Sequence, residues 1–163
     1  LLYAAQYPDE VDRVLAIGYP LEESMAHNRL RTAPPLELAE WLLGRAPSTE
    51  PVRADAPKTD QRAVAASFTS LGGVSYLDLW RRMNSACLLV NGATDTAVQP
   101  PRLEQLAEMA EQMHSILFEE SGHFPMLDEA SKFNRLLADF FALPTGESPR
   151  QLQLKEEWKR RVR

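Results

Sequence analysis

Short apolar runs alternate along the chain with stretches whose apolar residues recur at helical spacing. Runs of three or four apolar residues are typical of strands that a parallel sheet buries on both faces, and they occur at residues 14–17, 88–90 and 116–118. Helical periodicity marks residues 1–6, 100–113 and 128–141. Strands that alternate with helices predict an α/β fold, in which the three strands pair in parallel and in chain order through right-handed crossovers.

Two of these helices show an apolar side that we expect to face the core. In the stretch 100–113, which two prolines open, this side consists of Leu103, Leu106, Ala107, Ala110 and Met113. In the stretch 128–141 it consists of Phe133, Leu136, Leu137, Phe140 and Phe141.

The chain between residues 20 and 71 departs from this alternation. It contains a polar, proline-rich stretch, 45–58, and helices are expected around it near residues 22–30, 36–43 and 59–70, with one more near 76–83. A long insertion between two strands predicts a helical cap or lid over a binding site. The alternative is a surface connection that plays no part in substrate choice.

Both ends of the chain differ from the core. The opening helical stretch lacks the Ser, Thr, Asp or Asn that normally precedes a helix, so we expect further sequence upstream. Residues 144–163 predict a linker and a basic tail helix over 150–163, for which a solvated end is favoured over a membrane or partner contact. The expected division is a core of residues 1–19 and 72–143, a cap of residues 20–71, and this tail.

Charge and composition exclude several functions. The formal net charge of −5 argues against a nucleic-acid partner, because phosphate binding requires a basic face. No apolar run approaches the roughly 18 residues that a membrane helix requires. The single cysteine, Cys87, opens a buried strand, so we expect an inert thiol and, from the absence of any possible internal disulfide, a cytoplasmic location. No His, Cys, Asp and Glu grouping has the spacing of a metal site.

Two short motifs follow the second and third predicted strands. Asp95 lies in Asn-Gly-Ala-Thr-Asp-Thr, and His123 lies in Ser-Gly-His-Phe-Pro. Because the carboxyl ends of neighbouring parallel strands meet at one edge of a sheet, where α/β proteins bind ligands, these two side chains can meet. A carboxylate beside a histidine fixes the imidazole tautomer and prepares the other ring nitrogen to take a proton. The alternatives are an ordinary turn carboxylate and an ordinary loop histidine.

Three other polar residues are given lesser roles. His27 lies in the predicted cap and is a minor candidate for substrate contact. His114 follows an amphipathic stretch and is expected to be exposed. Asp128 is expected near the start of a helix, where the helix dipole favours a carboxylate.

The order of these motifs resembles the α/β-hydrolase family. Gly92-x-x-Asp95, followed after a helix and a strand by Gly122-His123-Phe124-Pro125, is similar to that family's acid and histidine loops. Residues 4–14 resemble the helix and strand after its nucleophile elbow, and residues 67–71 and 77–79 resemble its return from the cap. The resemblance covers residues 1–143. It implies the last three strands of an α/β-hydrolase fold, with Asp95 as the acid and His123 as the base of a catalytic triad.

The resemblance also implies a nucleophile that the chain does not contain. No G-x-S-x-G elbow is present, and no strand–turn–helix setting surrounds Ser24, Ser48, Ser67, Ser70, Ser75 or Ser121. We expect the nucleophile upstream, so that the chain by itself is inactive and poorly stable.

The resemblance therefore predicts a hydrolase of small ester, lactone or similar acyl substrates, with no cofactor and the oligomeric state left open. Trp41, Leu42 and Leu43 in the predicted cap favour a substrate with an apolar part. The alternatives are an epoxide hydrolase, dehalogenase, C–C hydrolase, haloperoxidase or acyltransferase, and a non-catalytic interaction protein on the same fold.

Overall fold

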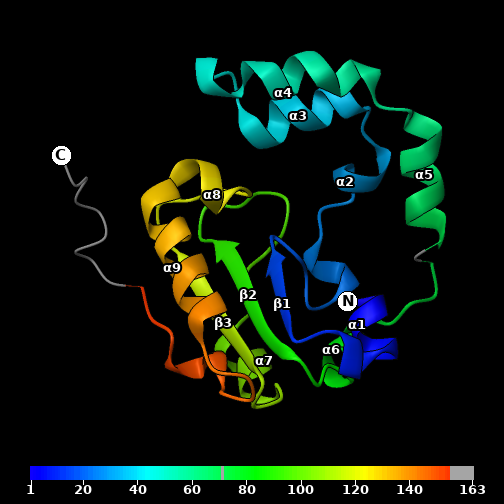
Figure 1. Ribbon diagram of the computed structural model, residues 1–163. Helices are drawn as coiled ribbons and strands as arrows, with labels where there is room; N and C mark the ends of the chain where they lie inside the picture. Colours follow the sequence, from blue (N-terminus) through cyan, green and yellow to red (C-terminus); the bar gives the residue numbers. More distant parts are fainter. Residues whose placement is uncertain (71, 155–163) are drawn as a thin grey trace.

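The computed structural model describes residues 1–70 and 72–154, with a three-stranded parallel sheet at the centre. The strands lie in the order β1 (Arg13–Ile17), β2 (Ala86–Gly92) and β3 (Met113–Phe118), as Figure 1 shows. Every residue of β2 except Ala86 is buried, which explains its continuous apolar run. The predicted strands, their parallel pairing and their order are confirmed.

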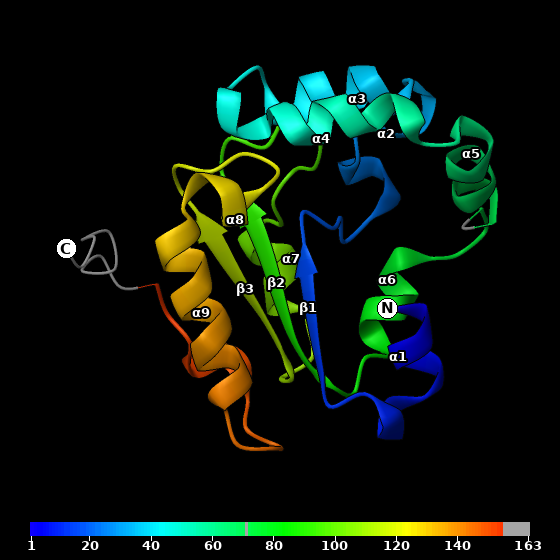
Figure 2. The ribbon, with the colours of Figure 1, turned by 45° about the horizontal axis from the view of Figure 1, so that its top comes forward.

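Helices cover both faces of the sheet. One face carries α1 (Leu2–Gln6), which the 3-10 turn η1 (Pro8–Glu10) joins to β1, and α6 (Tyr76–Arg81), whereas the other carries α9 (Ala130–Ala142) (Figure 2). Successive residues of a strand point to opposite faces. Cys87 and Leu89 therefore pack with Trp80 of α6, whereas Leu88 and Val90 belong to the core cluster beneath α9.

A helical segment lies beyond the carboxyl ends of the strands, with α3 and α4 beside each other (Figure 1 and Figure 2). Its elements are η2 (Glu23–Met25), α2 (Arg29–Thr32), α3 (Pro35–Leu43), η3 (Pro47–Thr49), α4 (Glu50–Asp55), η4 (Ala56–Lys58) and α5 (Gln61–Ser70). The continuous helix expected over residues 22–30 is wrong. It breaks after Met25 because Ala26 forms an antiparallel bridge with Val98, which requires extended backbone.

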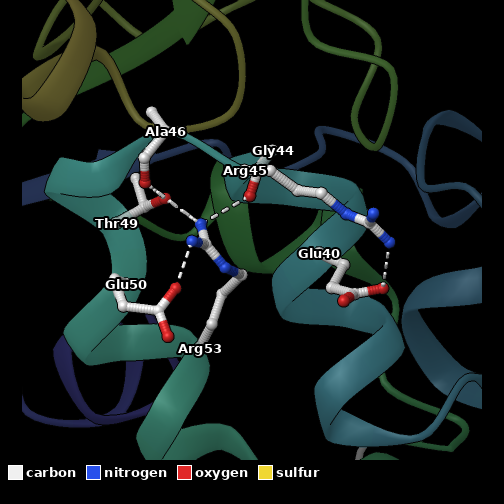
Figure 3. Close-up of polar contacts among 7 residues, drawn as sticks. All are labelled: Glu40, Gly44, Arg45, Ala46, Thr49, Glu50 and Arg53. Carbon is white, nitrogen blue, oxygen red and sulfur yellow. Dashed lines mark hydrogen bonds and ion pairs between the residues drawn. The ribbon is translucent and has the colours of Figure 1, made fainter.

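The proline-rich stretch 45–58 is helical, and Arg53 holds its first turn against α3. Each proline of this stretch lies in the first turn of a short helical element. In a first turn the backbone N–H that proline lacks would have no partner within the helix, so no hydrogen bond is lost. The Arg53 guanidinium donates to the carbonyl of Gly44 (2.8 Å) and to the Thr49 hydroxyl, and it pairs with Glu50 (Figure 3). Arg45, by contrast, is exposed and forms an ion pair with Glu40.

The helix expected over residues 100–113 is wrong in length. α7 covers only Leu103–Ala107, its first residue is exposed rather than buried, and Met113 already belongs to β3. The chain turns in between because the Arg150 guanidinium donates to the carbonyls of Met109 and Ala110 (3.1 Å each). A side chain distant in sequence thus satisfies carbonyls that a longer helix would have used.

The helix expected over residues 128–141 is two helices. α8 (Pro125–Asp128) and α9 are separated by Glu129, whose backbone (φ −123°, ψ 50°) is not helical. A proline opens α8, and Asp128 lies in the first turn of this four-residue helix, near a helix start as expected. Phe141, expected to be buried, is exposed because it follows Phe140 by one residue and points away from the sheet.

The segment after α9 packs against β3. It contains the 3-10 turn η5 (Pro149–Gln151), and His114 donates through Nε2 to the carbonyl of Leu152 (2.9 Å). His114 is therefore half-buried, not exposed as expected. Burial lowers the pKa of its imidazole, and the hydrogen bond to Leu152 opposes this only in part. Most of the predicted tail helix, residues 155–163, lies outside the described residues.

Candidate functional site

Two loops meet at the carboxyl edge of the sheet, where β2 and β3 end. The acid loop (residues 93–98) follows β2, and the histidine loop (residues 119–124) follows β3. The backbone N–H and the hydroxyl of Thr94 both donate to the carbonyl of Ser121, at 3.0 and 2.8 Å. Parallel pairing of the strands therefore brings the loops together, and Thr94 joins them.

Asp95 is held rigidly in the acid loop. Its Oδ1 accepts hydrogen bonds from the backbone N–H groups of Ala97 (2.7 Å) and Val98 (3.2 Å). Its Oδ2 accepts from Nδ1 of His123 at 2.8 Å, and the Asp95 side chain is 0% exposed. The contact that the sequence predicted between Asp95 and His123 is present, and neither side chain points away from the other.

His123 presents its second nitrogen for chemistry. Because a carboxylate can only accept, Nδ1 carries a proton, and in the neutral imidazole the lone pair is then on Nε2. Nε2 makes no hydrogen bond with the residues that the structure describes. The side chain is 16% exposed, and its ring packs edge-on against Phe124 (centroids 4.8 Å apart). This arrangement suits a general base.

Glycines make room for the histidine loop. Gly18, directly after β1, has φ 57°, and a Cβ there would lie 2.8 Å from Cε1 of His123. A Cβ on Gly92 would lie 2.0 Å from the carbonyl oxygen of Gly122. The Gly122 N–H donates to Asp128 (2.8 Å), which ties the loop to the end of α8. The sequence analysis found Gly92 as part of the acid-loop motif, but nothing local linked Gly18 or Asp128 to His123.

The start of the helical segment, at Ala26 and His27, pairs with the acid loop. His27 donates its backbone N–H to the carbonyl of Ala97 (2.7 Å), the same residue whose N–H holds Asp95. The His27 ring packs against Trp41 of α3 (centroids 5.1 Å apart), and Arg29 lies over the same indole. The structure thus places His27 apart from the contact between Asp95 and His123, at the joint between α3 and the acid loop.

Two buried polar groups lie on β2. Burial raises the pKa of the Cys87 thiol to about 12, so this thiol is not a nucleophile at neutral pH. Asn91, just before the acid loop, is fully buried, and neither amide atom has a hydrogen-bond partner among the described residues.

Within the described residues, no group of three or more His, Cys, Asp or Glu could hold a metal ion, and no helix has the length and apolarity to cross a membrane.

A parallel α/β sheet with its acid and histidine loops at the carboxyl edge defines the class of protein. The sequence profile described as the alpha/beta hydrolase family matches residues 2–136. The chain therefore belongs to the α/β-hydrolase family. No curated protein sequence matches it.

Solved structures share the same fold. An enol-lactonase from Burkholderia xenovorans LB400 aligns with a TM-score of 0.68 at 18% identity, over 86% of this chain and 60% of that one. A meta-cleavage product hydrolase from Pseudomonas fluorescens IP01 aligns with 0.60 at 21% identity, over 86% and 59%. A protein described as a putative aryl esterase from Burkholderia cenocepacia aligns with 0.63 at 23% identity, over 85% and 58%. The chain thus spans about three fifths of the structures it matches.

Proposed function

We propose that this protein is a hydrolase of small ester, lactone or similar acyl substrates, in which Asp95 and His123 serve a nucleophile outside the 163 residues. The observation that carries the proposal is the 2.8 Å contact between Oδ2 of Asp95 and Nδ1 of His123. A carboxylate so placed holds the imidazole in one tautomer and stabilises the imidazolium that forms during the reaction. The family membership of the chain supports the same assignment.

Each proposed step uses Nε2 of His123. This nitrogen takes the proton of the nucleophile as the nucleophile attacks the acyl carbon, and Asp95 stabilises the resulting cation. The proton then passes to the leaving alcohol, and a covalent acyl-enzyme remains. Nε2 next takes a proton from water, whose oxygen attacks the acyl carbon, and the acid leaves as the nucleophile recovers its proton from His123. The identity of the nucleophile separates this chemistry from that of epoxide hydrolases and dehalogenases.

We also propose that residues 20–71 act as a cap on the core of residues 1–19 and 72–143. Two observations support this. The helices α3 and α4 lie beyond the carboxyl ends of the strands (Figure 1), and Ala26 and His27 at the start of the segment pair with the acid loop. Trp41, Leu42 and Leu43 of α3 are only partly buried, and they would supply apolar contacts to the acyl or alcohol group of a substrate.

The test uses the full-length protein and a series of p-nitrophenyl esters of increasing acyl length, with one lactone. Asp95→Asn should lower kcat by roughly 10⁴-fold and change KM little, because the amide selects the wrong imidazole tautomer. His123→Ala should be at least as severe. Asp139→Asn, the same change on the exposed side of α9, is the matched control and should retain wild-type kcat. An Asp95→Asn variant as active as this control would contradict the proposal, as would a wild type that turns over no member of the series.

A further inference from the structure

A buried ion pair begins α9, next to the histidine loop. Nζ of Lys132 donates to Oε1 of Glu129 at 2.7 Å, and the two side chains are only 7% and 8% exposed. Removing two charges from water is costly, and apolar side chains of similar size commonly replace such a pair without loss of stability. Stability of the fold by itself therefore gives no reason for charges at this position.

The second oxygen of Glu129 is taken by the histidine loop. Oε2 accepts from the hydroxyl of Ser121 at 2.7 Å and from the backbone N–H of Glu120 at 3.3 Å. Burial alone raises the pKa of the Glu129 carboxyl, but the hydrogen bonds from Lys132 and Ser121 outweigh it and hold the pKa below its ordinary value. The carboxylate is therefore charged at neutral pH and free to accept all three bonds.

Ser121 connects Glu129 to both members of the proposed dyad. Its carbonyl accepts two hydrogen bonds from Thr94, the residue before Asp95, and its own backbone lies two residues before His123. A Cβ on Gly92 would lie 2.3 Å from the Ser121 carbonyl oxygen, so the backbone packs tightly at this point. Any displacement of Ser121 must therefore be passed to the acid loop and the histidine loop together.

We infer that Glu129, with Lys132 as its counter-ion, is a positioning residue that acts through Ser121 to keep Asp95 and His123 at hydrogen-bonding distance. This inference rests on the proposed function. A base displaced by a fraction of an ångström still leaves the substrate pocket intact, so the loss falls on turnover rather than on binding.

Three substitutions in the full-length protein separate the hydrogen bond between Ser121 and Glu129 from the ion pair between Glu129 and Lys132. Ser121→Ala removes the hydroxyl bond to Glu129 and leaves the bond from Lys132 in place. Ser121→Cys keeps the shape of the side chain with a somewhat larger atom at its end, but offers only a weak donor. Both should lower kcat by roughly 10- to 100-fold and leave KM within about twofold. Glu129→Gln keeps an amide oxygen that can accept from Ser121, so its loss of kcat should be smaller.

A spectroscopic readout follows the contact itself. The Nδ1 proton of His123, which is donated to Asp95, should give a downfield proton resonance in the wild type. The same resonance should appear in an Asp78→Asn control, because that substitution removes only an exposed ion pair with Arg81 on α6. Ser121→Ala and Ser121→Cys should shift or broaden that resonance. Thermal unfolding of each variant shows which of them are folded, and Ser121→Cys carries the test if Ser121→Ala does not fold.

The outcomes are distinguishable. If Ser121→Cys retains wild-type kcat and the proton resonance while His123→Ala abolishes turnover, the positioning role is wrong and the proposed hydrolase mechanism stands. If His123→Ala retains turnover, the hydrolase mechanism fails and the positioning role fails with it. A selective loss of kcat in both Ser121 variants, with a smaller loss in Glu129→Gln, supports the inference.

Discussion

At Gly18 a backbone constraint and a side-chain constraint coincide. Its φ of 57° lies in the left-handed region, which costs residues with a Cβ about 1–2 kcal/mol. The same Cβ would lie within van der Waals overlap of the His123 ring, 2.8 Å from Cε1 and 3.0 Å from Nδ1. A methyl group at position 18 therefore affects the stability of the fold and the place of the imidazole at once.

We expect Gly18→Ala to lower the free energy of unfolding by about 1 kcal/mol and, in the full-length protein, to lower kcat by up to about 100-fold. The matched control is Gly146→Ala. Gly146 also has a positive φ, of 87°, but a Cβ there would meet nothing within 4 Å. Urea unfolding and steady-state kinetics of both variants check this. Equal kcat values for the two would show that the ring does not depend on Gly18.

Asn91 is a second residue where a local change tests the structure. Its amide is fully buried with no hydrogen-bond partner among the described residues, and such a group costs about 1–3 kcal/mol. Asn91→Leu keeps the number and branching of the side-chain heavy atoms and removes both polar atoms, so it should raise the free energy of unfolding by about 1 kcal/mol in urea titrations. A loss of stability of that size would mean that the amide has a polar partner beyond the described contacts.

At the scale of elements, His114 on β3 makes the packing of the segment from Pro149 to Leu152 dependent on pH. His114 donates to the carbonyl of Leu152, and burial, the larger effect on its pKa, makes its charged form unfavourable in the folded state. The unfolded chain therefore binds more protons than the folded chain once the pH falls below the ordinary histidine value of 6.5. Stability rises with pH across that window and is lost as the pH falls through it.

The corresponding prediction compares the wild type with His114→Gln. The wild-type melting temperature should fall between pH 7.5 and pH 5.5 by more than that of the variant, because the variant has no imidazole to protonate. Both proteins share every other titrating group, so the difference between their two pH profiles isolates His114. Parallel profiles would mean that this buried histidine does not favour its neutral form in the folded state.

At the scale of the whole molecule, β1 and β3 are the two edge strands of the described sheet, and β1 is the one that follows the first helix of the chain. Among the described strands β1 pairs only with β2, so the N–H and C=O groups along its other edge lack strand partners. Such an edge is a template for association with other chains. The chain also carries the acid and the histidine of the proposed triad without a nucleophile elbow.

Expression of residues 1–163 alone should therefore give a protein that associates and shows no ester hydrolysis above the uncatalysed rate. Sedimentation velocity and the p-nitrophenyl ester series measure the two properties. A monomer that unfolds cooperatively and hydrolyses an ester, with activity abolished by His123→Ala, would show that the 163 residues are a complete enzyme.

The sequence by itself determined the parallel sheet and the pair of Asp95 and His123. Each strand contains a continuous apolar run, and the order of the strands along the chain is their order in the sheet, so the loops that follow β2 and β3 had to meet. These features depend on local periodicity and on a general rule for parallel strands. Both are visible without knowing any contact between distant residues.

Only the tertiary structure decided where helices break and what holds the site. α7 is short because Arg150 satisfies carbonyls about 40 residues away in the chain, and the helix near Met25 ends because Ala26 pairs with Val98. Gly18 and Glu129 likewise act on the histidine loop through contacts made after folding. Proline apart, local helix propensity differs between residues by at most about 1 kcal/mol, and side chains distant in sequence decide where the helices end.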